Sequence, residues 1–144
     1  MNKLIKYIFL NLIVAGFCGL VVAAESRAGL IEDFGGKSGL VKVVDDFMIG
    51  LLAEPKTKAS FINADQKHIK EMLVDQFCEL LDGPCKYTGK SMAKSHAGLG
   101  VDKSQFYALV ECLRTAMSKN NVPVRSQNKL LAKLAPMNRD IIEK

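Results

Sequence analysis

The sequence is poor in the residues from which metal sites and hydrolytic active sites are usually built. It contains only two histidines, His68 and His96, and four cysteines among 144 residues. No two cysteines have the short spacing of a zinc-binding motif, which argues against a closed zinc site. A glycine-rich phosphate loop, a strained nucleophile turn and an oxyanion-hole pattern are missing as well, so phosphate-binding and hydrolase chemistry have little support.

The sequence also lacks a convincing strand pattern, an internal repeat and a low-complexity tract. Its formal net charge is +5, but the lysines are scattered rather than concentrated, so we expect no nucleic-acid binding. What remains is a series of amphipathic segments with helical spacing. The expected architecture is therefore all-α, with a single domain after an amino-terminal leader.

The longest apolar run lies at the amino terminus. The segment MNKLIKYIFLNLIVAGFCGLVVAA places two lysines before an apolar stretch that ends in small residues, the layout of a secretory signal peptide. We expect residues 1–24 to be removed by cleavage after Ala24, with a cut after Ala28 as the alternative, which leaves residues 25–144. A retained membrane anchor is the competing interpretation. With the signal cleaved, we expect an exported, periplasmic protein without stable membrane insertion.

Export would permit a disulfide among the cysteines that follow the leader. These are Cys78, Cys85 and Cys112. Because their number is odd, at least one thiol stays unpaired. The sequence does not say which two cysteines approach each other, so the pairing is left open.

The spacing of apolar residues predicts several helices, and residues that cap or break helices mark their ends. Pro55 should end the first helix, and the segment from Pro55 to Asn63 should form a loop or short turns. Pro136 should kink or restart the last one. The predicted helices carry Leu40 to Leu51, Asp65 to Leu81, Ser91 to His96, Asp102 or Ser104 to Met117, and Leu130 to Ile142.

His96 stands out because it ends a short predicted helix just before Gly98 and Gly100. Taken alone, a histidine on a partly apolar helix is more often structural than functional. A single imidazole projecting from a short helix into an apolar cavity is, however, what a five-coordinate haem iron requires on its proximal side. The spacing therefore permits a haem site without requiring one.

From about Leu30 to Ile142 the chain resembles the group I truncated haemoglobins, the short globins with a two-over-two helical sandwich that encloses haem. The matching segments occur in the family's order and at its usual spacings. They are GG at Gly35 and Gly36, VVDDF at Val43 to Phe47, Phe61, GP at Gly83 and Pro84, YTGKSM at Tyr87 to Met92, HAGLGV at His96 to Val101, Phe106, and LAP at Leu134 to Pro136.

The resemblance implies a haem b cofactor with His96 as the proximal iron ligand. The sequence has no Cys-x-x-Cys-His motif, so we expect this haem to be non-covalent. Tyr87 could bond a haem propionate, with an exposed loop tyrosine as the alternative. The other side chains expected to contact haem, most of which also suit a generic core, are Phe47, Met48, Phe61, Ile69, Met72, Leu73, Phe77, Leu81, Met92, Val101, Phe106, Leu109, Val110, Leu130 and Leu134.

The chain departs from the family on the distal side of the haem. Where the family commonly has a tyrosine that donates a hydrogen bond to dioxygen, the matching residue is Met48. At the positions where family members often carry glutamine or another polar residue, this chain has Ile69, Met72 and Leu73. Thioether and alkyl groups do not donate hydrogen bonds, so avid oxygen storage is not expected.

We therefore expect an exported haem protein that reversibly binds a diatomic gas, O₂, NO or CO, in an unusually apolar pocket. Nitric oxide dioxygenation or peroxide turnover are conceivable side activities, but binding is preferred. The alternative is an electron-transfer protein with a redox partner, in which a second side chain fills the sixth iron position. A helical interaction module without haem is a third hypothesis. The candidate sixth ligands are Met72, Met48 and His68.

Overall fold

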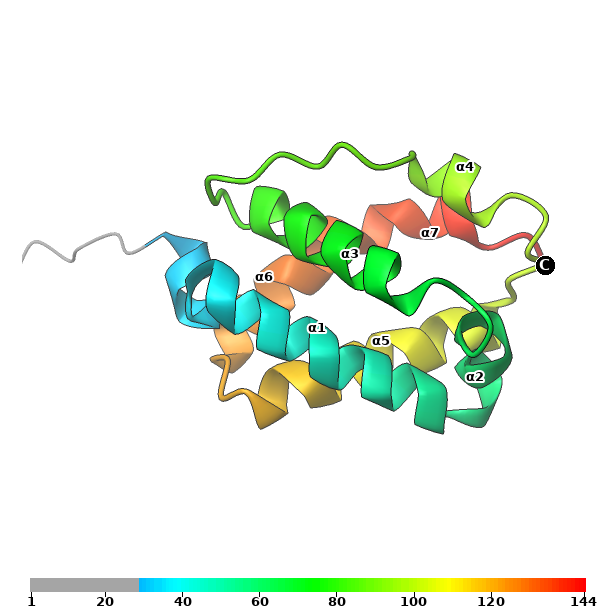
Figure 1. Cartoon of the computed structure of the whole chain (residues 1–144), viewed down its shortest axis with the longest axis horizontal. Helices are drawn as coiled ribbons and strands as arrows, with labels where there is room; N and C mark the ends of the chain where they lie inside the picture. Colours follow the sequence, from blue (N-terminus) through cyan, green and yellow to red (C-terminus); the bar gives the residue numbers. More distant parts are fainter. Residues whose placement is uncertain (1–28) are drawn as a thin grey trace, which may run out of the picture.

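The computed structural model describes residues 29–144, and its regular elements are all helical (Figure 1). The predicted signal peptide, residues 1–24, lies outside the described residues. No helix within residues 29–144 is long and apolar enough to cross a membrane. The elements are η1 (Leu30–Phe34), α1 (Gly36–Ala53), α2 (Pro55–Phe61), α3 (Gln66–Leu80), α4 (Met92–His96), α5 (Lys103–Lys119), α6 (Val124–Leu134), η2 (Ala135–Met137) and α7 (Asn138–Ile141).

The longer helices form two pairs that cross each other. α1 packs against both α3 and α5, while α6 packs against α5 and α3. Figure 1 shows α1 and α3 running in opposite directions, with α5 beneath α1 and α6 behind α3. The short helix α4 lies apart from α1 and rests on α7 near the carboxyl terminus (Figure 1). The predicted all-α, two-over-two architecture is confirmed.

Helix α1 supplies the centre of the core. Its apolar residues recur at helical spacing, so one face of the helix is covered by α3 and the other by α5. Leu40, Val43, Val44 and Leu51 have no accessible surface. Full burial of such a side chain contributes roughly 1.5–3 kcal/mol. The other members of the continuous core are Ile31, Phe34, Phe47, Val74, Phe77, Cys78, Leu81, Leu113, Ala116, Met117, Val122 and Leu130.

Side-chain caps begin the helices where the sequence predicts them. The carboxylate of Asp65 accepts a hydrogen bond from the backbone N–H of His68 at 3.0 Å and starts α3. Asp102 and Gln105 form a reciprocal capping box at the start of α5, with distances of 2.8 and 3.0 Å. Such caps satisfy backbone donors that have no partner in the first turn. The caps at Asp65 and Asp102 therefore fix where α3 and α5 begin.

The segment after Pro55 corrects one prediction. It forms the helix α2, Pro55–Phe61, instead of a loop or short turns. The prediction was wrong because proline breaks a helix interior but suits its first turn, where no N–H is required. The side chain of Glu54 caps this turn by accepting from the backbone N–H of Lys56 at 3.1 Å. The hydroxyl of Thr57 is buried and donates to the carbonyl oxygen of Leu51 at 2.8 Å, which ties α2 to α1.

The predicted break at Pro136 is confirmed. α6 ends at Leu134, Pro136 lies in the short 3-10 turn η2, and the chain restarts as α7. Because proline lacks an N–H and crowds the preceding turn, it prevents α6 from continuing as one helix. The break brings α7 beside α4 (Figure 1).

A disulfide settles the cysteine pairing that the sequence leaves open. Cys78, near the end of α3, is bonded to Cys85, in the extended segment that leads towards α4. Cys112 on α5 is free and half-buried. The bond anchors the start of a long irregular connection, residues 81–91, to the core.

Loss of this disulfide should lower the stability of the fold. We expect Cys85→Ala to reduce the free energy of unfolding of the oxidised protein by about 2–3 kcal/mol, because the unfolded chain gains the freedom that the loop closure removes. Denaturant unfolding measures the difference. Reduced wild-type protein should match the reduced variant, and Cys112→Ala should respond to reductant as the wild type does. Equal stability of the oxidised wild type and Cys85→Ala would contradict the pairing.

Candidate functional site

His96 lies at the end of α4, a helix of only five residues. The Ser91 side chain accepts a hydrogen bond from the backbone N–H of Lys94 at 3.4 Å and begins the helix, as predicted. After His96 the chain turns away through Gly98 and Gly100, whose φ angles are +77° and +63°. Residues with a Cβ atom rarely adopt such angles. The two glycines therefore permit the sharp exit from the helix.

The imidazole of His96 is oriented by its own helix. Its Nδ1 atom lies 2.8 Å from the carbonyl oxygen of Met92, one turn earlier. A carbonyl oxygen can only accept, so Nδ1 is the donor in this hydrogen bond, and in the neutral form of the ring Nε2 would carry the free lone pair. The side chain is half-buried. A neutral imidazole held in this way is the form that binds a metal through Nε2.

Several predicted haem-contacting side chains are apolar but only half-buried, and they stand outside the continuous core. They come from α3, α4, α5 and the turn before α5, and their half-buried apolar surface is of the kind that a flat apolar group could cover. Together with the imidazole of His96, these apolar side chains fit a haem. These side chains are Ile69 and Met72 on α3, Met92 on α4, Val101 before α5, and Phe106 and Val110 on α5.

Other predicted haem-contacting residues belong to the core or pack on it. Leu81 and Leu130 have no accessible surface, and Phe47 and Phe77 retain 2%, which identifies them first as core residues. Met48 is 4% exposed yet stands outside the continuous core. The half-buried side chains that pack against this core are Phe61, Leu73, Leu109 and Leu134.

The structure also gives the surroundings of Tyr87, His68 and Phe61. The Tyr87 hydroxyl donates to the carbonyl oxygen of Lys90 at 2.7 Å, so it stabilises the segment before α4. His68 is exposed on the first turn of α3. Phe61 is the last residue of α2 rather than part of a loop, because α2 extends to this position.

Gln76 is a residue that the sequence interpretation missed. It lies one turn after Met72 on α3 and is only 8% exposed. Its amide nitrogen approaches the sulfur atoms of Met92 at 3.7 Å and Met137 at 4.0 Å. Sulfur is a weak acceptor, so this buried amide connects α3 with α4 and η2 without a strong hydrogen bond. The buried face of α3 therefore includes one polar side chain, Gln76. The sequence alone gives no signal for it, because its burial and its contacts with Met92 and Met137 appear only in the folded chain.

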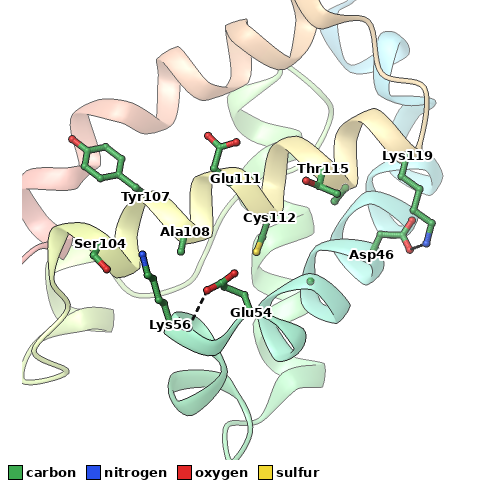
Figure 2. A pocket seen from close by; sticks show the side chains of 12 residues that line it. Asp46, Glu54, Lys56, Ser104, Tyr107, Ala108, Glu111, Cys112, Thr115 and Lys119 are labelled. Carbon is green, nitrogen blue, oxygen red and sulfur yellow. Dashed lines mark hydrogen bonds and ion pairs between the residues drawn. The ribbon is translucent and has the colours of Figure 1, made fainter.

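A groove lies on a different face of the molecule. It has a volume of about 660 Å³ and runs between α1, the start of α2 and α5. Figure 2 shows Cys112 on the α5 wall and Glu54 across from it, with Asp46 and Lys119 paired at one end. None of the residues predicted to contact haem lines this groove. α5 therefore turns one side towards the groove and the other towards the core and the candidate site.

The charged groups of this groove do not form a nucleophilic centre. Burial, followed by the nearby carboxylates of Glu54 and Glu111, raises the pKa of the Cys112 thiol above its ordinary value. Such a thiol stays protonated and unreactive near neutral pH. The hydrogen bond from Lys119, then that from Asn120, lowers the pKa of Asp46 and keeps it ionised. This surface is an ordinary solvated helix pair.

Comparison with known proteins gives the family. The model of the bacterial-like globins matches residues 29–143. The group 1 truncated hemoglobin of Tetrahymena thermophila is 31% identical over 93 residues, which cover 65% of this chain and 77% of that protein. The group 1 truncated hemoglobin GlbN of Mycolicibacterium paratuberculosis is 28% identical over 110 residues, or 76% of this chain and 81% of that protein.

Solved structures show the same arrangement of helices. The crystal structure of truncated hemoglobin from Tetrahymena pyriformis in its Fe(III) form superposes with a TM-score of 0.75 and 27% identity, over 80% of this chain and 98% of that chain. The 2/2 hemoglobin of Synechococcus, solved with covalently attached heme, has a TM-score of 0.74 at 22% identity and shows likeness of fold alone, covering 81% of this chain and 100% of that one. The predicted cofactor, non-covalent haem, is confirmed by the family. The chain therefore belongs to the bacterial-like globins and is similar throughout its described part to the group 1 truncated haemoglobins.

Proposed function

We propose that this protein reversibly binds a diatomic gas at the iron of a haem that His96 holds, in a pocket whose distal wall is apolar. Haem-based gas binding is the general property of the globin family to which the chain belongs. Haem supplies an iron atom with a position open to a small gas. The residues of this chain determine how the iron is held and how polar the surroundings of the gas are.

The hydrogen bond between His96 and Met92 carries the proposal. The 2.8 Å contact between Nδ1 and the Met92 carbonyl oxygen orients the ring of His96 and, in the neutral form, favours the tautomer with the proton on Nδ1. Such outer hydrogen bonds are typical of histidines that bind metals, because they leave Nε2 free and raise its basicity. His96 also begins the segment HAGLGV, whose resemblance to the family implies the proximal ligand.

The spacing of the distal residues supports the apolar wall. Three crystal structures of the Tetrahymena pyriformis truncated hemoglobin carry substitutions of a tyrosine at position 25 and of glutamines at positions 46 and 50 of that chain. Met48, Ile69 and Leu73 are spaced identically along this chain. Three side chains able to hydrogen-bond in that protein therefore correspond to three that have no donor here.

An apolar wall should alter the preference among gases. A hydrogen bond contributes about 0.5–1.5 kcal/mol net, and more with a charged acceptor. Dioxygen, which gains partial negative charge in a haem pocket, should be retained roughly tenfold less well without a donor. Nitric oxide and carbon monoxide remain less polar and should lose less. We therefore propose sensing or exchange of such gases rather than oxygen storage.

The alternative of an electron-transfer protein with a filled sixth position is not favoured. His68 is exposed on the first turn of α3, and a shift or rotation of the helix would be needed to bring it to the iron. Met48 and Met72 are near the expected pocket, but methionine more often fills gaps than binds iron. The family match also speaks against a helical interaction module without haem.

We also propose that the mature chain is exported to the periplasm. The amino-terminal segment has the pattern of a signal peptide. The bond between Cys78 and Cys85 supports this proposal, because disulfides persist mainly in oxidising compartments.

Replacement of the proximal histidine tests the proposed iron ligand. We expect His96→Gly to lose the five-coordinate ferrous spectrum and to retain haem poorly, because no other imidazole approaches the site. Added imidazole should restore the spectrum by occupying the space of the side chain. The matched control is His68→Gly, the other histidine of the chain, which should keep wild-type absorption with and without carbon monoxide. A wild-type spectrum for His96→Gly would refute the assignment.

Restoring a donor on the distal side tests the apolar wall. We expect Met48→Tyr to slow dioxygen dissociation by about tenfold, with a smaller effect on carbon monoxide. Met48→Phe is the control, since it has nearly the same ring without a hydroxyl. Stopped-flow measurements of the dissociation rates of dioxygen and carbon monoxide from both variants separate the effect of the hydroxyl from the effect of the larger side chain. If tyrosine and phenylalanine change dioxygen dissociation equally, Met48 does not face the bound gas.

A further inference from the structure

The carboxyl terminus is bonded to the turn that follows His96. The two carboxylate oxygens of Glu143 accept hydrogen bonds from the backbone N–H groups of Gly98, at 2.7 Å, and Gly100, at 2.6 Å. The backbone N–H of Glu143 in turn donates to the carbonyl oxygen of Val101 at 2.8 Å. Glu143 therefore contacts the turn between α4 and α5 through three hydrogen bonds.

This turn needs support from outside because α4 cannot hold itself. A helix of five residues falls far below the length at which an isolated helix is stable in water. His96 is its last residue, so the backbone on the carboxyl side of His96 is already non-helical. The position of the imidazole therefore depends on what holds the residues just after it. α4 rests on α7 (Figure 1). Glu143 lies two residues beyond the end of α7.

We call the two hydrogen bonds from Gly98 and Gly100 to the Glu143 carboxylate the clamp, and their chemistry suits this role. An ionised carboxylate that accepts two N–H groups makes charge-assisted hydrogen bonds, which are stronger than neutral ones. The left-handed angles of Gly98 and Gly100 turn both amides towards the same carboxylate, as in the concave anion sites that successive N–H groups form. Leu99 between them is 61% exposed and packs little. The clamp and the backbone hydrogen bond from the Leu99 N–H to the His96 carbonyl oxygen, at 3.1 Å, therefore contribute more to this turn than the Leu99 side chain does.

We propose that Glu143 is a positioning residue for His96: by clamping Gly98 and Gly100, the carboxyl-terminal segment sets the orientation of the proximal imidazole and how firmly it is held. This inference rests on the proposed role of His96 as the iron ligand. It adds a determinant of haem binding that lies outside the haem-contacting residues.

The clamp itself is tested without haem. Glu143→Gln removes the charge and one carboxylate oxygen but preserves size, and Asp140→Asn is the matched control, an exposed carboxylate on α7. Amide exchange measured by NMR on the haem-free protein should become about tenfold faster at Gly98 and Gly100 in Glu143→Gln. Asp140→Asn should leave both amides unchanged. Unchanged exchange in Glu143→Gln would overturn the clamp.

The effect on the histidine is tested in the haem-loaded protein. Resonance Raman spectra of the ferrous form report the iron–histidine stretching band, and transfer of haem to an acceptor globin reports haem loss. We expect Glu143→Gln to shift or broaden the band and to speed haem loss by about tenfold, with wild-type values for Asp140→Asn. Faster amide exchange with an unaltered band and rate would overturn the inference, because the turn would then not position His96.

The two proposals fail in different ways. If the stretching band persists in His96→Gly without added imidazole, the proposed ligand is wrong, whatever Glu143 does. If the band disappears in that variant but is identical in Glu143→Gln and the wild type, the ligand stands and the positioning role of Glu143 is overturned.

Discussion

The structure depends on holding one imidazole at the end of a helix too short to be stable alone. α4 has five residues, so its position is set by contacts with distant parts of the chain. It rests on α7, Met92 meets the amide of Gln76 on α3, and Glu143 holds the turn that follows. A hydrogen bond within α4 then orients His96. The histidine is therefore positioned by tertiary structure and oriented by local structure.

The two sides of the expected haem are built by different means. The proximal side relies on hydrogen bonds to backbone groups, which fix the His96 ring and the glycine turn. The distal side that we propose would rely on the apolar residues of α3 and on Met48, none of which offers a hydrogen-bond donor. Directional bonds suit a ligand that must point at one atom, while an apolar wall controls only polarity and access.

The helices that carry clear periodicity could be predicted from sequence, with their caps at Asp65, Ser91 and Asp102. α2 was missed because Pro55 suits a helix start as well as a helix end. The disulfide partners and the contacts of Gln76 and Glu143 join residues whose proximity only the folded chain defines. The local sequence pattern predicts the helices and His96 as the candidate iron ligand. The side chains that hold the helix of His96 in place are brought there by long-range packing, which the pattern does not reveal.

The separation between core and candidate site explains how one small domain can serve both purposes. Leu40, Val44 and Leu51 of α1 are buried completely without any contribution from a cofactor. The half-buried apolar residues, such as Met72 and Phe106, lie outside this core. Substitution of the latter therefore changes the surface offered to haem more than the packing that holds the helices together. For that reason the apolar distal wall that we propose is compatible with an intact two-over-two fold.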